Sequence, residues 1–416
     1  MDERPRNLKA MLAEAKDLSE LMVDLAYAAL YFGDPDMADE VTELEDHMND
    51  LVHDMRAVCV LAARQRKEAE AMASVLQVIG AIEGVANAAV DITRIVTHQL
   101  GIPRELVADL SNAEEVSHRV LVREGSHLAR RPLAALELPT ATGMRVMAIR
   151  RGHDWITDVE GEDILVPGDV MILRGSPAGI VRLRELAAAP FWEPPVPSED
   201  GSLTDLGRAV DVLVEMKNLS EVAVGLAYSS LVLGDASLAA EVRALEDRLD
   251  DMQDRLELWV LRAARDDLDP APLRGLLHLS QAAADLGDQA QQMVWLIEQR
   301  EELHPILRIA LGESDEVVVR VPVAAGSMAD GARLADLQLG VDPGFHILAI
   351  RRGGRYLYRP RGQVQLEPDD ELIASGPDEG HPILAERCGW RLIEDEGSTR
   401  LDLLPQVPLR GSGSRS

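Results

Sequence analysis

The chain is poor in cysteine and in lysine. Its 416 residues include two cysteines, Cys59 and Cys388, and four lysines, and its formal net charge is −30. Two isolated cysteines exclude a disulfide framework and a zinc site built from several thiolates. An acidic surface repels phosphate groups, which disfavours broad binding of nucleic acid or anionic lipid. Because a salt-filled cytoplasm favours an acid-rich, lysine-poor surface, we predict a protein of a halophilic archaeon.

Long apolar runs and the common patterns of catalytic sites are also missing. No stretch of about 18 apolar residues occurs, and Met1 to Leu12 lacks the apolar segment of a signal peptide. The glycine patterns of phosphate loops and dinucleotide sites are absent, and the ten histidines are scattered. We therefore predict a cytoplasmic protein that is not an enzyme and does not itself span a membrane.

What the chain does contain is an internal repeat. Aligned with itself at an offset of 201 residues, Leu25-Ala26-Tyr27 returns as Leu226-Ala227-Tyr228, and Ala148 to Gly152 returns as Ala349 to Gly353. The offset is the same for both phrases, so the copies align without a gap. A residue that is needed in both halves is therefore expected to occur twice.

Each copy opens with a helical pattern. Apolar residues recur at spacings of three and four, as in Leu18, Leu21, Met22 and Leu25. The sequence Gly33-Asp34-Pro35 is typical of one helix ending and another beginning. We predict a three-helix bundle at residues 1–104 and another at residues 204–305.

Each copy then changes to short β-rich runs. In the first copy, strands are predicted at Val116 to Val122, Met144 to Ile149 and Val170 to Leu173, with a short helix at Leu133 to Leu138. The predicted modules cover residues 112–188 and 313–393. Residues 189–203 are rich in proline and predict a linker, and residues 394–416 predict a disordered tail. The predicted fold class is α+β, built from two repeats.

Acidic residues on the second helix of each bundle form one candidate site. Spacings of four place carboxylates on one helical face, where their oxygens can bind a divalent cation. The candidate metal ligands are Glu45, Asp46 and Asp50 in the first copy and Glu246, Asp247 and Asp251 in the second. The alternative interpretation is a solvated acidic face.

Arginines at strand ends form a second candidate site. The guanidinium group suits phosphate or carboxylate, and these arginines stand out against an acidic background. The candidate ligand-binding residues are Arg119, Arg150 and Arg151 with their counterparts Arg320, Arg351 and Arg352. The alternative is a set of exposed ion pairs. Lys16 and Lys217, each followed one turn later by a glutamate, are expected to form surface ion pairs.

The helical halves resemble the PhoU family of helical-bundle proteins, which look after phosphate transport. The resemblance rests on Leu18 to Tyr27, Leu44-Glu45-Asp46 and Ile82 to Ala89. In that family the last phrase carries two metal-binding carboxylates four residues apart. Here Glu83 is followed by Asn87, and in the second copy Asp285 by Gln289, so one carboxylate is missing each time. The resemblance therefore implies the fold more than the metal site.

The β-rich modules resemble the TrkA C-terminal domain, a regulatory part of potassium channels, potassium uptake systems and cation antiporters. The phrases that carry the resemblance are Val116 to Gly125, Leu133 to Leu138, Met144 to Gly152 and Pro167 to Gly175, with Val317 to Gly326, Leu334 to Leu339, Phe345 to Gly353 and Pro368 to Gly376. Such modules pair, and some relatives bind cyclic di-AMP between the partners. The resemblance implies a homodimer or an intrachain pseudo-dimer, with the six candidate arginines around one cleft.

Together the two resemblances imply a regulator of cation transport, most simply of potassium. Its expected partners are a membrane transporter or channel and a small ligand, such as cyclic di-AMP or a divalent cation, and it is expected at the inner face of the membrane. No nucleic-acid partner is expected. The alternative function is a metal-binding, PhoU-like regulator of phosphate or divalent-cation transport.

Overall fold

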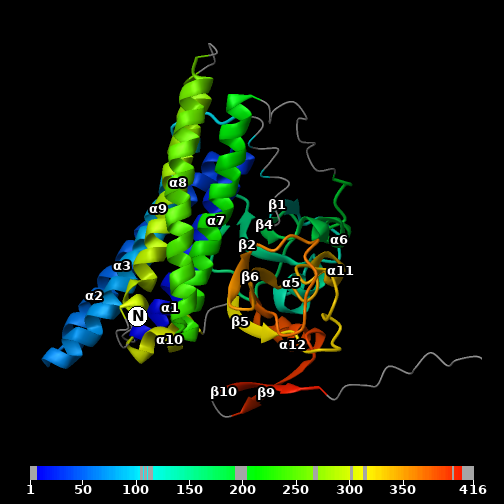
Figure 1. Ribbon diagram of the computed structural model, residues 1–416. Coiled ribbons are helices and arrows are strands. Elements are labelled where there is room, and N and C mark those ends of the chain that lie inside the picture. Colours follow the sequence, from blue (N-terminus) through cyan, green and yellow to red (C-terminus); the bar gives the residue numbers. More distant parts are fainter. Residues whose placement is uncertain are drawn as a thin grey trace, which may run out of the picture.

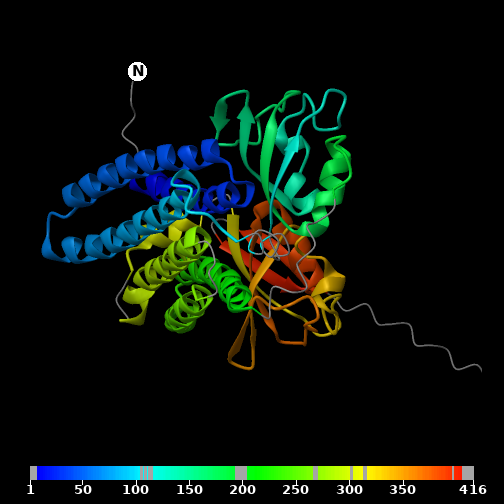
Figure 2. The same ribbon diagram turned by 90° about the horizontal axis from the view of Figure 1, so that it is seen from above.

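The computed structural model describes residues 7–103, 106, 110, 116–192, 204–265, 270–299, 303–312, 316–395 and 398–404. Helices from both repeats form one elongated body, and two sheet modules lie together beside it (Figures 1 and 2). Most of the predicted linker, from residue 193 to 203, and the end of the predicted tail, from residue 405, lie outside the described residues.

The body contains three long helices from each repeat. They are α1 (Leu8–Phe32), α2 (Pro35–Ala62) and α3 (Arg66–Thr97), then α7 (Asp205–Leu233), α8 (Ala236–Ala263) and α9 (Pro270–Glu298). Helix α1 ends at Gly33, whose φ of 60° lies in the left-handed region that glycine tolerates, and the Asp34 side chain then accepts from the Met37 N–H to begin α2. Gly234 and Asp235 repeat this turn between α7 and α8.

The two bundles share a single core. Buried residues of all six helices form one continuous apolar cluster, in which α3 packs against α9 across the boundary between the repeats. Gly84 lies at this contact, and a side chain there would overlap the Gln289 side chain. A further short helix, α10 (Pro305–Leu311), packs against α1 and α7. The prediction of two bundles is confirmed. The bundles pack against each other and form one body with a shared core.

Each module is a four-stranded antiparallel sheet. The first contains β1 (Val116–Leu121), β2 (Met144–Arg151), β3 (Asp154–Ile156) and β4 (Val170–Gly175) in the order β1-β4-β2-β3. The second contains β5 (Glu316–Pro322), β6 (His346–Arg352), β7 (Arg355–Tyr358) and β8 (Glu371–Pro377) in the order β5-β8-β6-β7. Both sheets have a bulge at the equivalent place, between Val146 and Ala148 and between Ile347 and Ala349. The two sheets are thus the same structure repeated, register included.

Short helical turns cover these sheets. They are η1 (Leu133–Ala135), α5 (Leu138–Thr142), η2 (Pro177–Gly179) and α6 (Ile180–Leu186) in the first module, and α11 (Leu334–Leu337), η4 (Asp378–Gly380) and α12 (His381–Arg387) in the second. Each sheet has its own small apolar core on this side. On its other side, residues such as Met147, Ala148 and Ile172 join the core of the helical body. Each module is therefore packed between its own helices and the body.

The prediction of disorder from residue 394 was wrong for residues 394–395 and 398–403. Strands β9 (Trp390–Asp395) and β10 (Ser398–Leu403) form a hairpin there. Trp390 donates a hydrogen bond from Nε1 to the Pro322 carbonyl oxygen at 2.6 Å, and Leu404 N–H donates to Gly389 at 2.9 Å. The hairpin is thereby attached to the end of β5. The acidic composition of this segment suggested disorder, but β5 supports the hairpin through the bond from Trp390.

In the part of the chain that the structure describes, one helix, α3, is long and apolar enough to cross a membrane by length and composition alone. Within its apolar window, 61% of the residues are buried inside the body. Core helices of folded bundles pass the same test, because one apolar face packs against neighbouring helices.

Candidate functional site: the junction of the body and the modules

Three of the six predicted arginines attach the modules to the turns of the body, and a fourth, Arg351, pairs within its own module. The Arg119 and Arg150 guanidiniums lie 3.7 and 3.8 Å from the Asp34 carboxylate, at the turn between α1 and α2. In the second repeat, Arg320 pairs with the equivalent Asp235. Their partners also include aromatic rings and β8: Arg119 lies over Phe32 and Arg150 over Trp155, while Arg351 donates to Glu371 at 2.7 Å.

The other two arginines hold loops inside the modules. Arg151 donates from Nε and one terminal nitrogen to the two oxygens of the buried Asp169, both at 2.9 Å. Arg352 makes the same pair of bonds to Asp370, at 2.7 and 2.6 Å. Burial disfavours the charged form of Asp169, but its hydrogen bonds from Arg151 and from the Val166 N–H keep its pKa below the ordinary value. Asp169 therefore holds the loop before β4 in place.

The expected cleft of six arginines is not found among the described residues. The two modules do contact each other, through the loop before β2 and the loop before β6: Gly143 approaches the Gly340 carbonyl, and Gly344 approaches Pro139. The chain thus contains the intrachain pair of modules that was expected. However, the arginines point toward the body or toward loops of their own module, because carboxylates there neutralise them.

A cavity of about 1190 Å³ lies instead where the helices and both modules meet. Helices α1 and α7 form one wall, and strands β2, β4, β6 and β8 with their loops form the other. Charged groups on its wall include Glu20, Asp24 and Glu221 from the helices and Arg145 and Arg174 from the first module. A molecule in this cavity would contact both repeats at once.

Near this cavity, a lysine of each repeat contacts a tyrosine of the other repeat. The Lys16 ammonium lies 5.2 Å from the centre of the Tyr228 ring, and the Lys217 ammonium lies 5.1 Å from that of Tyr27. Each lysine also pairs with the glutamate one turn later, at 2.8 Å. The prediction of surface pairs was wrong, since the exposed fractions of Lys16 and Lys217 are 1% and 7%. Their conservation in both copies was the signal of this role.

The two tyrosines are also buried between α1 and α7. Ser19 Oγ lies 2.8 Å from the Tyr228 hydroxyl oxygen, which joins α1 to α7 directly. Burial, followed by the nearby Glu221, raises the pKa of Tyr27 well above its usual value, and burial with Glu20 does the same for Tyr228. Both phenols are therefore neutral, and their rings face the buried ammonium groups as uncharged aromatic surfaces.

An ion-pair network attaches the first module to the body at the cavity. The Arg145 guanidinium lies 3.1 Å from the Asp24 carboxylate, and Arg174 pairs with Asp24 and, at 3.1 Å, with Glu221. Arg174 thereby joins α1 to α7. Burial alone would raise the pKa of Glu221, but Arg174 and Lys217 lower it, so the carboxylate is ionised. Sequence analysis missed this network because Asp24, Arg145 and Arg174 have no counterparts of the same type in the second copy.

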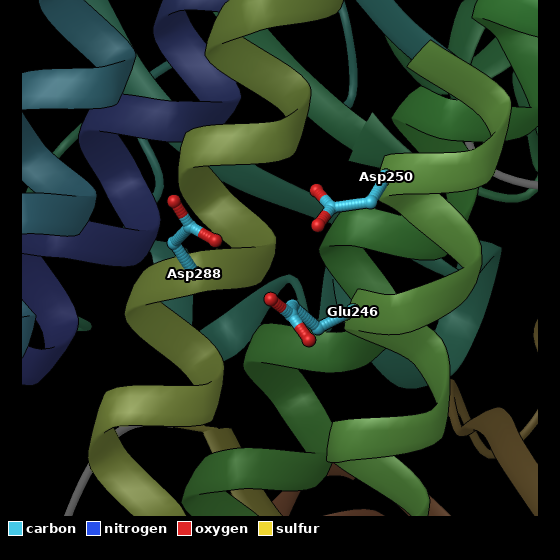
Figure 3. A group of neighbouring side chains, drawn as sticks. All are labelled: Glu246, Asp250 and Asp288. Atoms are coloured by element: carbon cyan, nitrogen blue, oxygen red, sulfur yellow. The ribbon is translucent and has the colours of Figure 1, made fainter. Parts of the chain in front are cut away.

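A separate acidic group lies on the outside of the body. Glu246 and Asp250 of α8 and Asp288 of α9 point toward one another, with ligand oxygens within 4.8 Å (Figure 3). Burial, together with the neighbouring carboxylates, raises the pKa of both Glu246 and Asp288. Three such oxygens suit a hard divalent cation.

The predicted metal ligands only partly coincide with this acidic group. Glu246 belongs to it, whereas Asp247 and Asp251 do not. At the offset of 201 residues, the equivalent positions in the first copy are Glu45, Asn49 and Asn87, so the counterpart of Asn87 is Asp288 and not Gln289, as the prediction had it. Among the residues that the structure describes, Glu45, Asp46 and Asp50 form no comparable group of three. Repetition was thus a poor guide here, since the group exists in one copy only.

Comparison with known proteins identifies both kinds of domain. The family model described as the PhoU domain matches residues 12–96 and 213–294, and the one described as the TrkA-C domain matches residues 118–188 and 318–381. No curated protein matches the chain.

Solved structures share only limited likeness with the whole chain. PhoU from Pseudomonas aeruginosa aligns with 13% identity and a TM-score of 0.37, over 70% of this chain and 93% of that one. The GsuK RCK domain aligns with 17% identity and a TM-score of 0.18, over 67% of this chain and 64% of that one. The GsuK channel bound to NAD aligns with 13% identity and a TM-score of 0.18, over 75% and 65%. At these scores the structures say nothing about what this chain binds.

Proposed function

Because this chain contains two PhoU domains that alternate with two TrkA-C domains, we propose that it regulates the transport of a cation, most simply potassium, across a membrane. Its domains are regulatory domains of ion transport. In this proposal the chain acts at the inner face of the membrane, where it binds a transporter or channel. It responds to a small ligand or ion at its TrkA-C modules.

The observation that carries the proposal is the shared junction. Arg174 of the first module joins α1 and α7 through Asp24 and Glu221, and a cavity lined by both modules lies beside it. A ligand that favours one arrangement of a module on the body shifts the whole chain toward that arrangement, with a typical coupling of about 1–3 kcal/mol. The junction therefore supplies a physical route from a ligand to a transporter bound elsewhere on the chain.

The proposal predicts a role for Arg174 in cation transport. Rubidium, a tracer for potassium, would be followed in cells lacking the native copy and supplied with the wild type, Arg174→Ala or Arg182→Ala. Arg182 is an exposed residue of α6 that pairs with Glu185 at 3.1 Å, which makes it a matched control. We expect the wild type and Arg182→Ala to restore the rubidium uptake rate, and Arg174→Ala to leave it several-fold altered at equal protein abundance. A rate that does not depend on the chain at all would contradict the proposal.

A second candidate function follows from the acidic group of α8 and α9. Glu246, Asp250 and Asp288 favour a metal-binding regulator of phosphate or divalent-cation transport, acting through the helical body. In that case a divalent cation, rather than an organic ligand such as cyclic di-AMP, would be the signal.

A further inference from the structure

The two junctions between body and modules are built at equivalent positions from different residues. Arg145 and Arg174 are cross-strand partners in the first sheet, and His346 and Ser375 are cross-strand partners at the same place in the second. Across from them, Asp24 of α1 corresponds to Gly225 of α7. The second junction therefore has neither the two guanidiniums nor the carboxylate of the first.

In the first junction, guanidinium groups fill the space between sheet and helices. Arg174 extends from β4 to Asp24 and Glu221, and Arg145 extends from β2 to Asp24 at 3.1 Å. The side chain of Asp24 is 5% exposed and that of Arg174 is 17% exposed. A guanidinium donates several N–H groups in a fixed plane, which suits two carboxylates from different helices.

The cavity borders both junctions, and in the second junction no guanidinium from β6 or β8 extends into it. Gly225, His346 and Ser375 all line it, together with Glu20, the counterpart of Glu221. Arg174 reaches Glu221, but its counterpart Ser375 has a side chain of only two heavy atoms. Glu20 pairs with Lys16 at 2.8 Å, within its own helix. At the position of Arg174, the second sheet therefore supplies a hydroxyl group and not a guanidinium.

The charges and the unsatisfied atoms of the cavity favour a cation that donates N–H groups. Its lining contains eight carboxylates against four lysines and arginines. Two buried acceptor atoms on its wall, Asn218 Oδ1 and Glu221 Oε1, receive no hydrogen bond. A buried acceptor without a donor is unfavourable, so a ligand with N–H groups gains free energy by supplying one.

We propose that the cavity binds a small organic cation whose guanidinium or primary ammonium group takes, in the second junction, the place that Arg174 takes in the first. The cation pairs with Glu20 and lies beside Ser375, while the Leu348 side chain packs against Gly225. Bound there, it holds the second module to the body as Arg174 holds the first. This inference rests on the proposed function only in making the ligand a regulatory signal; the binding itself does not require it.

Agmatine, which carries a guanidinium at one end and an ammonium at the other, tests the proposal by isothermal titration calorimetry on the full chain. We expect one site per chain. Ser375→Arg supplies the missing guanidinium from the protein itself, so it should weaken agmatine binding at least tenfold and raise the melting temperature. Glu20→Gln should weaken binding similarly, while Asp46→Asn, which removes an equal charge from exposed α2, should leave it unchanged.

A second variant tests the equivalence of the two junctions. Arg174→Ser creates in the first junction the space found in the second, so its melting temperature should fall, and agmatine should restore part of the loss. Potassium and sodium chloride at equal ionic strength should give neither effect. The proposal is overturned by the absence of binding at millimolar agmatine, by unchanged binding to both Ser375→Arg and Glu20→Gln, or by an equal response to the alkali salts. Failure of agmatine to bind, with rubidium uptake still dependent on Arg174, would overturn this inference and leave the proposed function intact.

Discussion

At the scale of single residues, the two copies differ in the ion pairs of the aspartate that begins their second helix. Asp235 caps α8, accepting from the Ser237 N–H and hydroxyl, and pairs with Arg320 of the second module. Burial alone would raise the pKa of Asp235, but these hydrogen bonds and the arginine lower it to about 2. A carboxylate with a lowered pKa stabilises the fold above its ordinary pKa of 3.8, and this contribution is lost as the pH falls toward 2.

Asp235→Asn should therefore destabilise the chain in a pH-dependent way. Asparagine retains the helix cap but loses the charge, so we expect a loss of about 2 kcal/mol at pH ~7, shrinking as the pH approaches ~2. Urea unfolding at several pH values measures it. Asp34→Asn is the matched control: its arginines lie 3.7 and 3.8 Å away, and we expect less than about 1 kcal/mol. Equal losses in both variants at every pH would show that the ion pair with Arg320 is not the cause.

Sequence reasoning found the residues that recur in both copies and misjudged where they lie. Lys16 and Lys217 sit in a helical pattern that is also satisfied by surface ion pairs, and only the packing of α1 against α7 places each on a tyrosine of the other repeat. The arginines at strand ends form ion pairs within the chain, as in the alternative interpretation. Their partners, Asp34 and Asp235, could not be chosen from the sequence, because an acidic chain offers too many carboxylates.

At the scale of elements, the long helices and three of the four strands of each sheet were predicted, whereas the short edge strands β3 and β7 were not. A period of three to four residues shows which face of a helix is buried, and the turn at Gly33-Asp34 shows where one long helix ends. Helix α10 and the hairpin β9-β10 were missed. Both are short, and the hairpin is supported by a bond from Trp390 to a distant carbonyl rather than by a pattern of its own.

The acidic group on α8 and α9 gives a prediction at this scale, because it needs two helices. If it binds a metal, Mn²⁺ should raise the melting temperature of the wild type, since a ligand of the folded state stabilises it by mass action. Asp250→Asn should remove most of that rise, while Asp251→Asn, the adjacent residue outside the group, should retain it. A rise that survives in Asp250→Asn, or no rise at all, would argue against a site at Glu246, Asp250 and Asp288.

At the scale of the whole molecule, the duplication has produced one body with two unequal attachments. The continuous core of α1–α3 and α7–α9 makes the halves inseparable, and the modules contact each other across Gly143 and Gly340. At the cavity the first module is held by Arg145 and Arg174, whereas the second has His346 and Ser375 at the equivalent places and is held by Arg320 at Asp235. Such an asymmetry lets a ligand act on one module while the other stays fixed.

Distances between a spin label on the body and one on a module test most directly whether the two modules are held unequally. Labels would be placed on cysteines introduced at exposed, equivalent positions: Glu43→Cys with Glu185→Cys for the first repeat, and Ala244→Cys with Glu386→Cys for the second. We predict a narrow distance distribution for the first pair with or without agmatine, and a broader distribution for the second that narrows when agmatine is added. Distributions of equal width in the two repeats, unchanged by agmatine, would contradict the account.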